Sequence, residues 1–303
     1  MRIIKPLVIL LSAALLLLGG ATSCDLGSVD RAAQEASGVV PLAEGEIAVH
    51  FLDVGQGDSI FAELPEGKTM LIDAAERDCG AGIADFIRDR GYERIDYLVV
   101  THPHADHIGS MEFIVRRFEI GEVWLPNVAA NTLMFERLMD AIREKQLTVR
   151  EGRAGETVFS SGGCRAQILA PAVIDEEELN NCSIVMRLDY GEASFLFTGD
   201  AQEEELGSIA DDKVSADVLK VSHHGSVNGN PEDFLQRSAP QIAVISCGRN
   251  NDYGHPHRGT LERLEALRCR VYRTDRDGTV TVRSDGRKLS VTTGEKSIVR
   301  VRA

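Results

Sequence analysis

Three histidines and one aspartate follow directly after a run of residues typical of a buried strand, IDYLVVT at 95–101. Alternate side chains of an extended loop point the same way, so His102 and His104 can converge on one ion. Asp106 and His107 can turn to a second ion as the next helix begins. Imidazole and carboxylate ligands suit zinc, iron and manganese. The segment therefore predicts a metal site at the end of a strand.

Three further polar motifs also follow strand-like runs. In TGD, Asp200 could bridge two metals, but aspartate at a strand-to-helix junction is also a common N-cap. In KVSHHGS, His223 and His224 supply one more imidazole at the same sheet edge. In YGHPH, His255 and His257 stand before a helix, where they form either a structural turn or proton donors. Histidines at strand ends thus recur along the chain.

The pattern of strands and helices predicts an α/β (α+β) fold in which two mixed halves pack their sheets together. Runs typical of strands stand at 47–54, 59–64, 68–74, 164–171, 183–191 and 241–247. The apolar fraction of 43% is ample for a packed core. We expect one domain over 46–294, ending in a β-meander over 270–294, and a C-terminal tail at 295–303.

The N-terminus reads as an export signal. Basic residues precede an uncharged run at 6–18, which is shorter than the roughly 20 residues that span a bilayer. We expect a signal peptide at 1–23, a lipobox that ends in ATSC with Cys24 as the lipidated residue, and a flexible tether at 25–45. The mature protein would be an extracytoplasmic lipoprotein of the cell membrane, held by its lipid anchor; if Cys24 is incidental, it is secreted.

The net charge of −14 argues against a broad basic face that grips nucleic acid. Loss of Arg2 and Lys5 with the signal peptide takes the charge to −16. If nucleic acid is the substrate, bound metals and a few local cations such as Lys220 and Arg258 must bind it. Five cysteines follow Cys24, but none forms a CxxC pair, which disfavours a cysteine zinc site.

The motifs HxHxDH, TGD and KVSHHGS, in this order, resemble the metallo-β-lactamase fold superfamily. The segments FLDVGQGDSI at 51–60, LKVSHHGS at 219–226 and YGHPH at 253–257 are similar to the nuclease-like domain of the ComEC DNA-uptake proteins and its stand-alone relatives. The resemblance runs from about residue 46 to about residue 290. It implies a four-layer αββα sandwich with a metal site at one edge of the paired sheets.

The resemblance also implies roles for single residues around two divalent ions, zinc or manganese. One ion takes His102 and His104, the other takes Asp106 and His107, Asp200 bridges them, and either His223 or His224 completes the second site. The superfamily often has a third histidine at the first site, whereas this chain has Asn181 in that region. An amide oxygen is a weaker ligand, so we expect a looser first site that tolerates manganese.

Two ions that share a water lower its pKa towards neutrality and polarise the bond under attack. The candidate catalytic residues are Asp106, His223, His224, His255 and His257. The expected activity is hydrolysis of a phosphodiester, in DNA (single strands included) or another nucleic acid, with a link to DNA uptake. The alternatives are a surface phosphodiesterase of phosphocholine or teichoic-acid-like polymers, and a non-catalytic metal-binding lipoprotein. No protein partner follows from the sequence.

The turn in DVGQGDS allows two interpretations. Gly55 and Gly57 permit a tight hairpin turn, which is the interpretation we favour from the sequence. Alternatively, Gln56 or Asp58 supports a metal-bound histidine from behind.

Overall fold

A computed structural model describes residues 40–295 and 297–298 of the 303-residue chain. The expected signal peptide at 1–23, the lipidation site Cys24 and most of the expected tether lie outside the described residues. Of the expected C-terminal tail, Ile298 is buried, and its backbone N–H donates to the carbonyl of Asp53. Among the described residues, no helix is long and apolar enough to cross a membrane.

The first sheet has eight strands in the order β15-β14-β1-β2-β3-β4-β5-β6. Its strands are β1 (Ile47–Phe51), β2 (Ile60–Glu63), β3 (Thr69–Ile72), β4 (Arg94–Val99), β5 (Glu119–Leu125), β6 (Thr148–Glu151), β14 (Thr279–Ser284) and β15 (Leu289–Glu295). Strands β3 to β6 run parallel, and the other pairs in the sheet are antiparallel.

The second sheet has seven strands in the order β13-β12-β11-β10-β9-β8-β7. Its strands are β7 (Thr157–Ser161), β8 (Cys164–Ala170), β9 (Val185–Tyr190), β10 (Ala193–Phe197), β11 (Val218–Lys220), β12 (Ile242–Ile245) and β13 (Arg270–Arg273). Strands β10 to β13 are parallel, so each sheet has one antiparallel and one parallel half.

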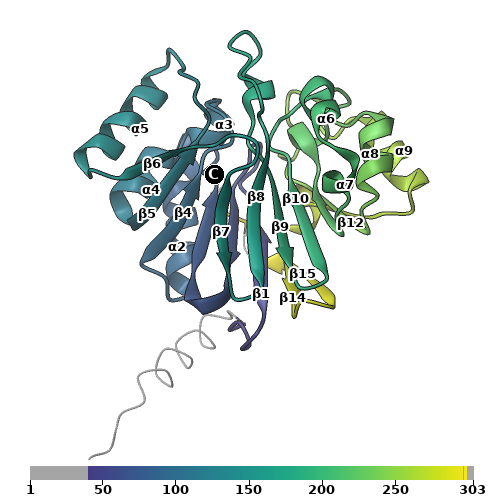
Figure 1. Cartoon of the computed structure of the whole chain (residues 1–303), viewed down its shortest axis with the longest axis horizontal. Helices are drawn as coiled ribbons and strands as arrows, with labels where there is room; N and C mark the ends of the chain where they lie inside the picture. Colours follow the sequence, from purple (N-terminus) through teal and green to yellow (C-terminus); the bar gives the residue numbers. More distant parts are fainter. Residues whose placement is uncertain (1–39, 296, 299–303) are drawn as a thin grey trace, which may run out of the picture.

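Helices cover the outer face of each sheet, as Figure 1 shows. The first sheet carries α2 (Gly80–Asp89), α3 (Ala105–Ile108), α4 (Met111–Arg117) and α5 (Leu133–Glu144). The second carries α6 (Glu203–Ser208), α7 (Asp211–Val214), α8 (Glu232–Ser238), α9 (Arg258–Ala266) and α10 (Thr274–Asp277). Short 3-10 turns are η1 (Pro65–Gly67), η2 (Arg77–Cys79), η3 (Leu179–Cys182) and η4 (Ser222–Gly225).

Three separate apolar clusters hold the four layers together, one at each interface. Strand β10 shows how one segment serves two of them. Phe195 and Phe197 face the cluster between the sheets, whereas Leu196 faces the cluster under the helices of the second sheet. Side chains alternate along a strand, so a continuous apolar run such as ASFLF belongs in a strand buried on both faces. The predicted αββα sandwich is confirmed.

The predicted β-meander at the C-terminus is wrong in one respect. The hairpin of β14 and β15 turns near Asp285, as expected, but β13 pairs with β12 in the other sheet. Helix α10 lies between β13 and β14 and takes the chain from one sheet to the other. Which sheet a strand joins depends on long-range packing, and the local periodicity of the sequence does not report that packing.

Candidate metal centre

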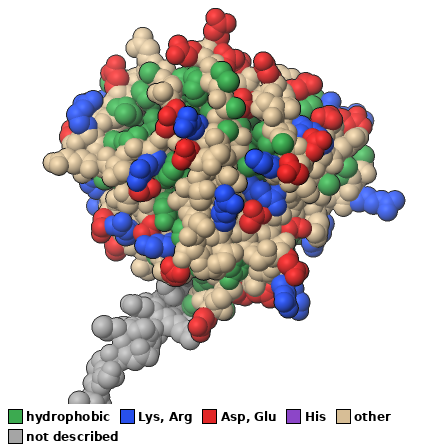
Figure 2. All heavy atoms as spheres, in the orientation of Figure 1, with side chains coloured by type: hydrophobic (Ala, Val, Ile, Leu, Met, Phe, Trp, Pro, Cys, Tyr) green, Lys and Arg blue, Asp and Glu red, His purple; other side chains and the backbone are tan. Residues whose placement is uncertain are grey.

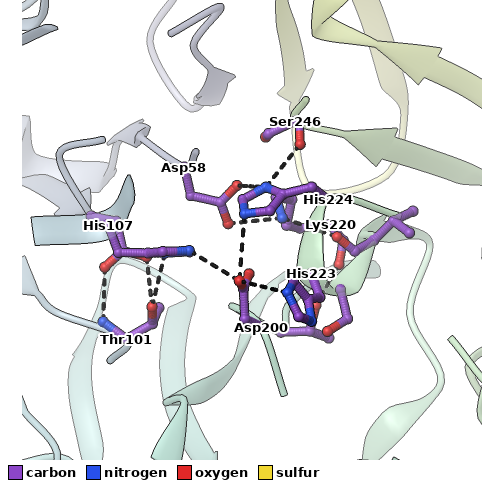
Figure 3. Close-up of polar contacts among 12 residues, drawn as sticks. Asp58, Thr101, His107, Asp200, Lys220, His223, His224 and Ser246 are labelled. Atoms are coloured by element: carbon purple, nitrogen blue, oxygen red, sulfur yellow. Dashed lines mark hydrogen bonds and ion pairs between the residues drawn. The ribbon is translucent and has the colours of Figure 1, made fainter. Parts of the chain in front are cut away.

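The predicted site residues gather where parallel strands of both sheets end. His102, His104, Asp106 and His107 follow β4, Asp200 follows β10, and His223 and His224 follow β11. Because carboxyl ends of neighbouring parallel strands meet at one sheet edge, two sheets packed face to face bring their loops together. Figure 3 shows Asp200 at the middle of this group, with histidines on several sides of it.

Four of these residues place one ligand atom each within 4.8 Å of the others: Asp106, His107, Asp200 and His224. His224 Nε2 lies 3.1 Å from Asp106 Oδ2 and 3.4 Å from Asp200 Oδ2. His107 Nε2 lies 3.3 Å from Asp200 Oδ2. Two imidazoles and two carboxylates that face one another form a ligand set suited to a divalent ion.

A second pair of imidazoles lies beside this group. His102 Nε2 and His104 Nδ1 are 3.0 Å apart, and the His102 and His107 rings are 4.2 Å apart between centroids. The two ligand groups are therefore neighbours, as a dinuclear site requires.

The outward nitrogens of three of these histidines are held by oxygen acceptors. His107 Nδ1 donates to Asp73 Oδ2 at 2.7 Å, and His224 Nδ1 donates to the Ser246 carbonyl at 3.0 Å. Thr101 Oγ1 gives its one proton to Asp73 at 2.6 Å, so it accepts from His102 Nδ1 at 3.1 Å. Each arrangement directs Nε2 at the centre, as in metal-binding histidines.

The buried atoms at the centre that have no hydrogen-bond partner among the described residues include His107 Nε2 and Asp200 Oδ1. Buried polar atoms are rarely left unpaired, because each one costs about 1–3 kcal/mol. Together with the oriented imidazoles, these atoms fit a bound cation.

The carboxylates and imidazoles at the centre shift one another's protonation. Burial opposes the charged form of His107, but Asp200, Asp73 and Asp106 raise its pKa well above the usual value. Burial likewise opposes ionisation of Asp200, but His224 and His107 hold its pKa well below the usual range. Protons on imidazoles thus balance the buried negative charge, and divalent cations would take over this role while releasing those protons.

The two adjacent histidines of η4 have different surroundings. His224 is buried, whereas the His223 side chain is 25% exposed, and its Nε2 lies 3.7 Å from Asp200 Oδ2. Both residues have positive φ, 47° and 54°, which is uncommon outside glycine. From this strained turn both rings reach Asp200, as Figure 3 shows; His224 also contacts Asp106, and His223 is the more exposed of the two.

His255 and His257 also lie apart in role. The His255 ring is 5.6 Å from that of His223, and its Nδ1 is buried without a partner. Burial, with His224 and His223 nearby, lowers the pKa of His255 to about 4. His257 Nδ1 accepts from the backbone N–H of Val227, so this ring holds the loop before α9 rather than facing the centre.

The side-chain oxygen of Asn181 accepts a backbone hydrogen bond. The donor is the backbone N–H of Gln202, at 3.0 Å. Ser183 stands nearer to the histidine pair, with its Oγ 3.3 Å from His102 Nδ1. A role for Asn181 as a metal ligand remains a prediction.

Sequence reasoning missed Asp73, which holds both Thr101 and His107. The available signal was its position at the end of β3, the parallel neighbour of β4. The turn before β2 is more than a hairpin connection. The Asp58 backbone N–H donates to the Asp106 carbonyl, and a Cβ on Gly57 would lie 2.4 Å from that same oxygen. Only glycine allows this close approach.

Lys220 is not the solvent-facing cation that we expected. It is 0% exposed, and its Nζ lies 2.8 Å from Asp58 Oδ2. Arg258 is exposed but pairs with Glu262 at 2.6 Å. Acidic and basic side chains are intermixed on the face that Figure 2 shows.

Comparison with known proteins agrees with this geometry. The profile of the Metallo-beta-lactamase superfamily matches residues 52–249, well over half of the chain. The chain belongs to this superfamily. It is accordingly a metal-dependent hydrolase by family, and its described residues include a possible metal site.

The chain is similar to curated proteins that include Competence protein ComA of Neisseria gonorrhoeae, which is 28% identical over 78% of this chain and 32% of that protein. The ComE operon protein 3 of Bacillus subtilis is 31% identical, over 82% of this chain and 34% of that protein. Recombination protein 2 of Haemophilus influenzae is 29% identical, over 77% of this chain and 28% of that protein. The chain spans about a third of the length of these relatives. Among solved structures, Zn(2+)-bound PqqB from Methylobacterium extorquens has the same fold, with a TM-score of 0.51, 11% identity, and coverage of 78% of this chain and 99% of PqqB.

Proposed function

We propose that this chain is a phosphodiesterase that cleaves nucleic acid with two divalent ions, zinc or manganese. The observation that carries the proposal is the adjacency of the two ligand groups, His102 with His104, and Asp106 with His107, Asp200 and His224. When bound, such ions would activate a water molecule and polarise the phosphorus–oxygen bond. The names of the relatives, a recombination protein and competence proteins, support DNA as the substrate.

Water is the nucleophile that the surrounding residues favour. Burial raises the pKa of the Cys79 thiol to about 11 and that of Cys247 to about 12, so both are protonated at neutral pH. His223 is the imidazole best placed to give a proton to the leaving oxygen, because it is partly exposed and adjoins Asp200. The His255 ring lies edge-on to it, 5.6 Å away between ring centroids.

We further propose that the two metal sites differ in affinity. The group around Asp200 offers two imidazoles and two carboxylates, whereas the neighbouring group offers the imidazoles of His102 and His104. The first of these groups should hold its ion more tightly. Metal analysis of purified protein that finds two tightly held zinc ions per chain would contradict this.

The proposed location is the outer side of the cytoplasmic membrane, with a lipid anchor on Cys24. The apolar run and lipobox in the sequence support it. Incorporation of labelled palmitate into the wild type but not into Cys24→Ser tests it, and equal labelling of both would contradict it.

The activity test compares two substrates with manganese, magnesium or zinc. Bis-p-nitrophenyl phosphate reports any phosphodiester hydrolysis, and labelled single-stranded DNA reports nuclease action. We expect both to be cleaved, and Asp200→Asn to abolish both activities. Cleavage of the small ester alone would contradict the nucleic-acid substrate and favour another surface phosphodiester. Cleavage of neither would favour a metal-binding protein without catalysis.

A further inference from the structure

A surface groove beside α3 and α4 combines an exposed aromatic ring with arginines. Its volume is about 410 Å³, and it is lined by Arg77, Gly109, Glu112, Phe113, Arg116 and Arg117. Phe113 is 43% exposed. In the described part of the chain, Phe113 and Tyr253 are the two aromatic residues among the large exposed hydrophobics. An exposed phenyl ring within a groove is a surface on which a flat ligand can stack.

The three arginines of this groove differ in how far the protein itself neutralises them. Arg116 pairs with Glu112 at 3.0 Å and also with Glu144. Arg77 and Arg117 are exposed, and neither has an ion-pair partner among the described residues. The groove therefore presents two free guanidinium groups in a chain whose net charge is −14. Guanidinium groups bind phosphate well, because their N–H donors match its oxygens.

The groove adjoins the metal centre. Gly109 follows α3, the single turn that carries Asp106 and His107, and a Cβ on Gly109 would lie 2.5 Å from the backbone nitrogen of Arg77. The turn of Arg77 thus packs directly on α3. Asp106 and the groove are separated by about one helical turn, or about 5 Å of helix.

We propose that this groove binds a nucleotide of a single-stranded nucleic acid whose scissile bond lies at the metal centre. Arg77 and Arg117 contact phosphates, and Phe113 stacks on a base. Aromatic stacking combined with backbone cations is the usual way in which proteins hold single strands without reading sequence. The inference rests on the proposed nuclease function and names the residues that bind the strand.

The opposite side of the centre offers a second stacking surface. Tyr253 is 66% exposed, and its ring stacks on His255 at 5.6 Å. Figure 1 places α4 and the α9 side of the molecule on opposite flanks of the sheets.

A membrane surface fits the groove less well. One phenyl ring and two free cations on an acidic protein are a small footprint for a lipid surface, because such binding grows with apolar area and basic charge. A concave site of this size suits a single nucleotide better than a plane of headgroups.

The test measures binding and cleavage of a labelled twelve-residue oligothymidylate by the full chain. The variants are Arg77→Ala/Arg117→Ala and Phe113→Ala. The matched control is Arg287→Ala/Lys288→Ala, which removes two exposed cations from the β14–β15 turn. Arg77→Lys/Arg117→Lys keeps the charge and controls for folding. Turnover of bis-p-nitrophenyl phosphate is measured in parallel, and binding is measured at several salt concentrations.

We expect Arg77→Ala/Arg117→Ala to raise the oligonucleotide Kd at least tenfold. The slope of log Kd against log salt should fall by about 1.4, since each phosphate contact on a single strand contributes about 0.7. Phe113→Ala should raise Kd about fivefold or more with the slope unchanged. In both alanine variants, the kcat/KM for the oligonucleotide should fall relative to that for the small ester. The lysine variant should keep the salt slope of the wild type. The Arg287→Ala/Lys288→Ala control should match the wild type throughout.

Two results would overturn the inference while nuclease activity stands. One is an Arg77/Arg117 variant that binds and cleaves the oligonucleotide like the Arg287/Lys288 control. The other is a groove variant that binds the oligonucleotide like the wild type but no longer binds phosphatidylglycerol vesicles, because that result would assign the groove to lipid binding. A wild type that cleaves the small ester but neither binds nor cleaves the oligonucleotide would instead overturn the proposed function itself.

Discussion

Asp58 and Lys220 form a buried ion pair, 2.8 Å from Oδ2 to Nζ, that joins the two halves of the sandwich directly behind the metal centre. Asp58 precedes β2 in the first sheet, and Lys220 ends β11 in the second. The other Asp58 oxygen lies 3.4 Å from His224 Nδ1, and the Asp58 backbone N–H donates to the Asp106 carbonyl. Through Asp58, the ion pair thus contacts two candidate ligands, Asp106 from the first sheet and His224 from the second.

Lys220→Met should leave Asp58 as an uncompensated buried charge and cost about 3–5 kcal/mol of unfolding free energy. The double variant Asp58→Asn/Lys220→Met should recover much of this loss, because it removes both charges. Urea unfolding of the metal-free protein measures both values, with Lys288→Met, an exposed lysine, as the control. A single variant as stable as this control would show that the pair contributes little.

Asp73→Asn should weaken metal binding without altering a ligand atom. Asp73 accepts from His107 Nδ1 and from the Thr101 hydroxyl, and loss of such a partner commonly lowers metal affinity about 10–100-fold. Titration calorimetry with manganese measures the change. Asp85→Asn on the exposed face of α2 is the matched control, and equal affinities in the two variants would argue against the role of Asp73.

His224→Ala and His223→Ala should impair different properties, metal binding in the first and turnover in the second. His224 faces Asp106 and Asp200, so its removal should release metal. His223→Ala should keep its metal and lower kcat for bis-p-nitrophenyl phosphate about 10²–10⁴-fold, the range for loss of a general acid. Metal content per chain and kcat are measured on the same preparations. Loss of metal from His223→Ala with retention in His224→Ala would reverse the assignment.

Glu205 should make the protein less stable as the pH rises. Burial and the nearby charge of Glu204 raise the pKa of Glu205 to about 7 from an ordinary 4.5. The folded state therefore favours the protonated acid. Its contribution is complete below the ordinary pKa, and it is lost as the pH rises through about 7.

Glu205→Gln should consequently gain about 2 kcal/mol over the wild type between pH 5 and pH 8. Urea unfolding at both pH values measures this gain, and Glu203→Gln, exposed on the same helix, is the control. The same pH dependence in the wild type and in Glu205→Gln would show that the carboxyl titrates normally.

The site residues that could be predicted from sequence are those that lie close together in the chain and have side chains that suit a metal ion. The six residues from His102 to His107 define a ligand loop because a strand must end before them. Asp73 was missed, and Asp58 was named only in the less favoured interpretation of its turn, because each acts on a residue more than 30 positions away, His107 and Asp106 respectively. Which strands become neighbours decides such contacts, and strand pairing is set by the whole core.

Lys220 shows the opposite error. Next to two histidines, a lysine looked available for phosphate, but the β11 position is buried on both faces, and Asp58 meets it there. The sequence does not show how deeply a charged side chain is buried. For the same reason, Arg77, Phe113 and Arg117 could be recognised as a possible binding site only once their exposure and shared groove were known.

Cleavage of labelled single-stranded DNA by the metal-loaded protein, with Asp200→Asn as the blank, tests the proposed nuclease activity. We expect shorter products that depend on an added divalent ion and disappear in Asp200→Asn. DNA that stays intact with manganese, magnesium and zinc, while the protein is shown to carry its metals, would contradict it.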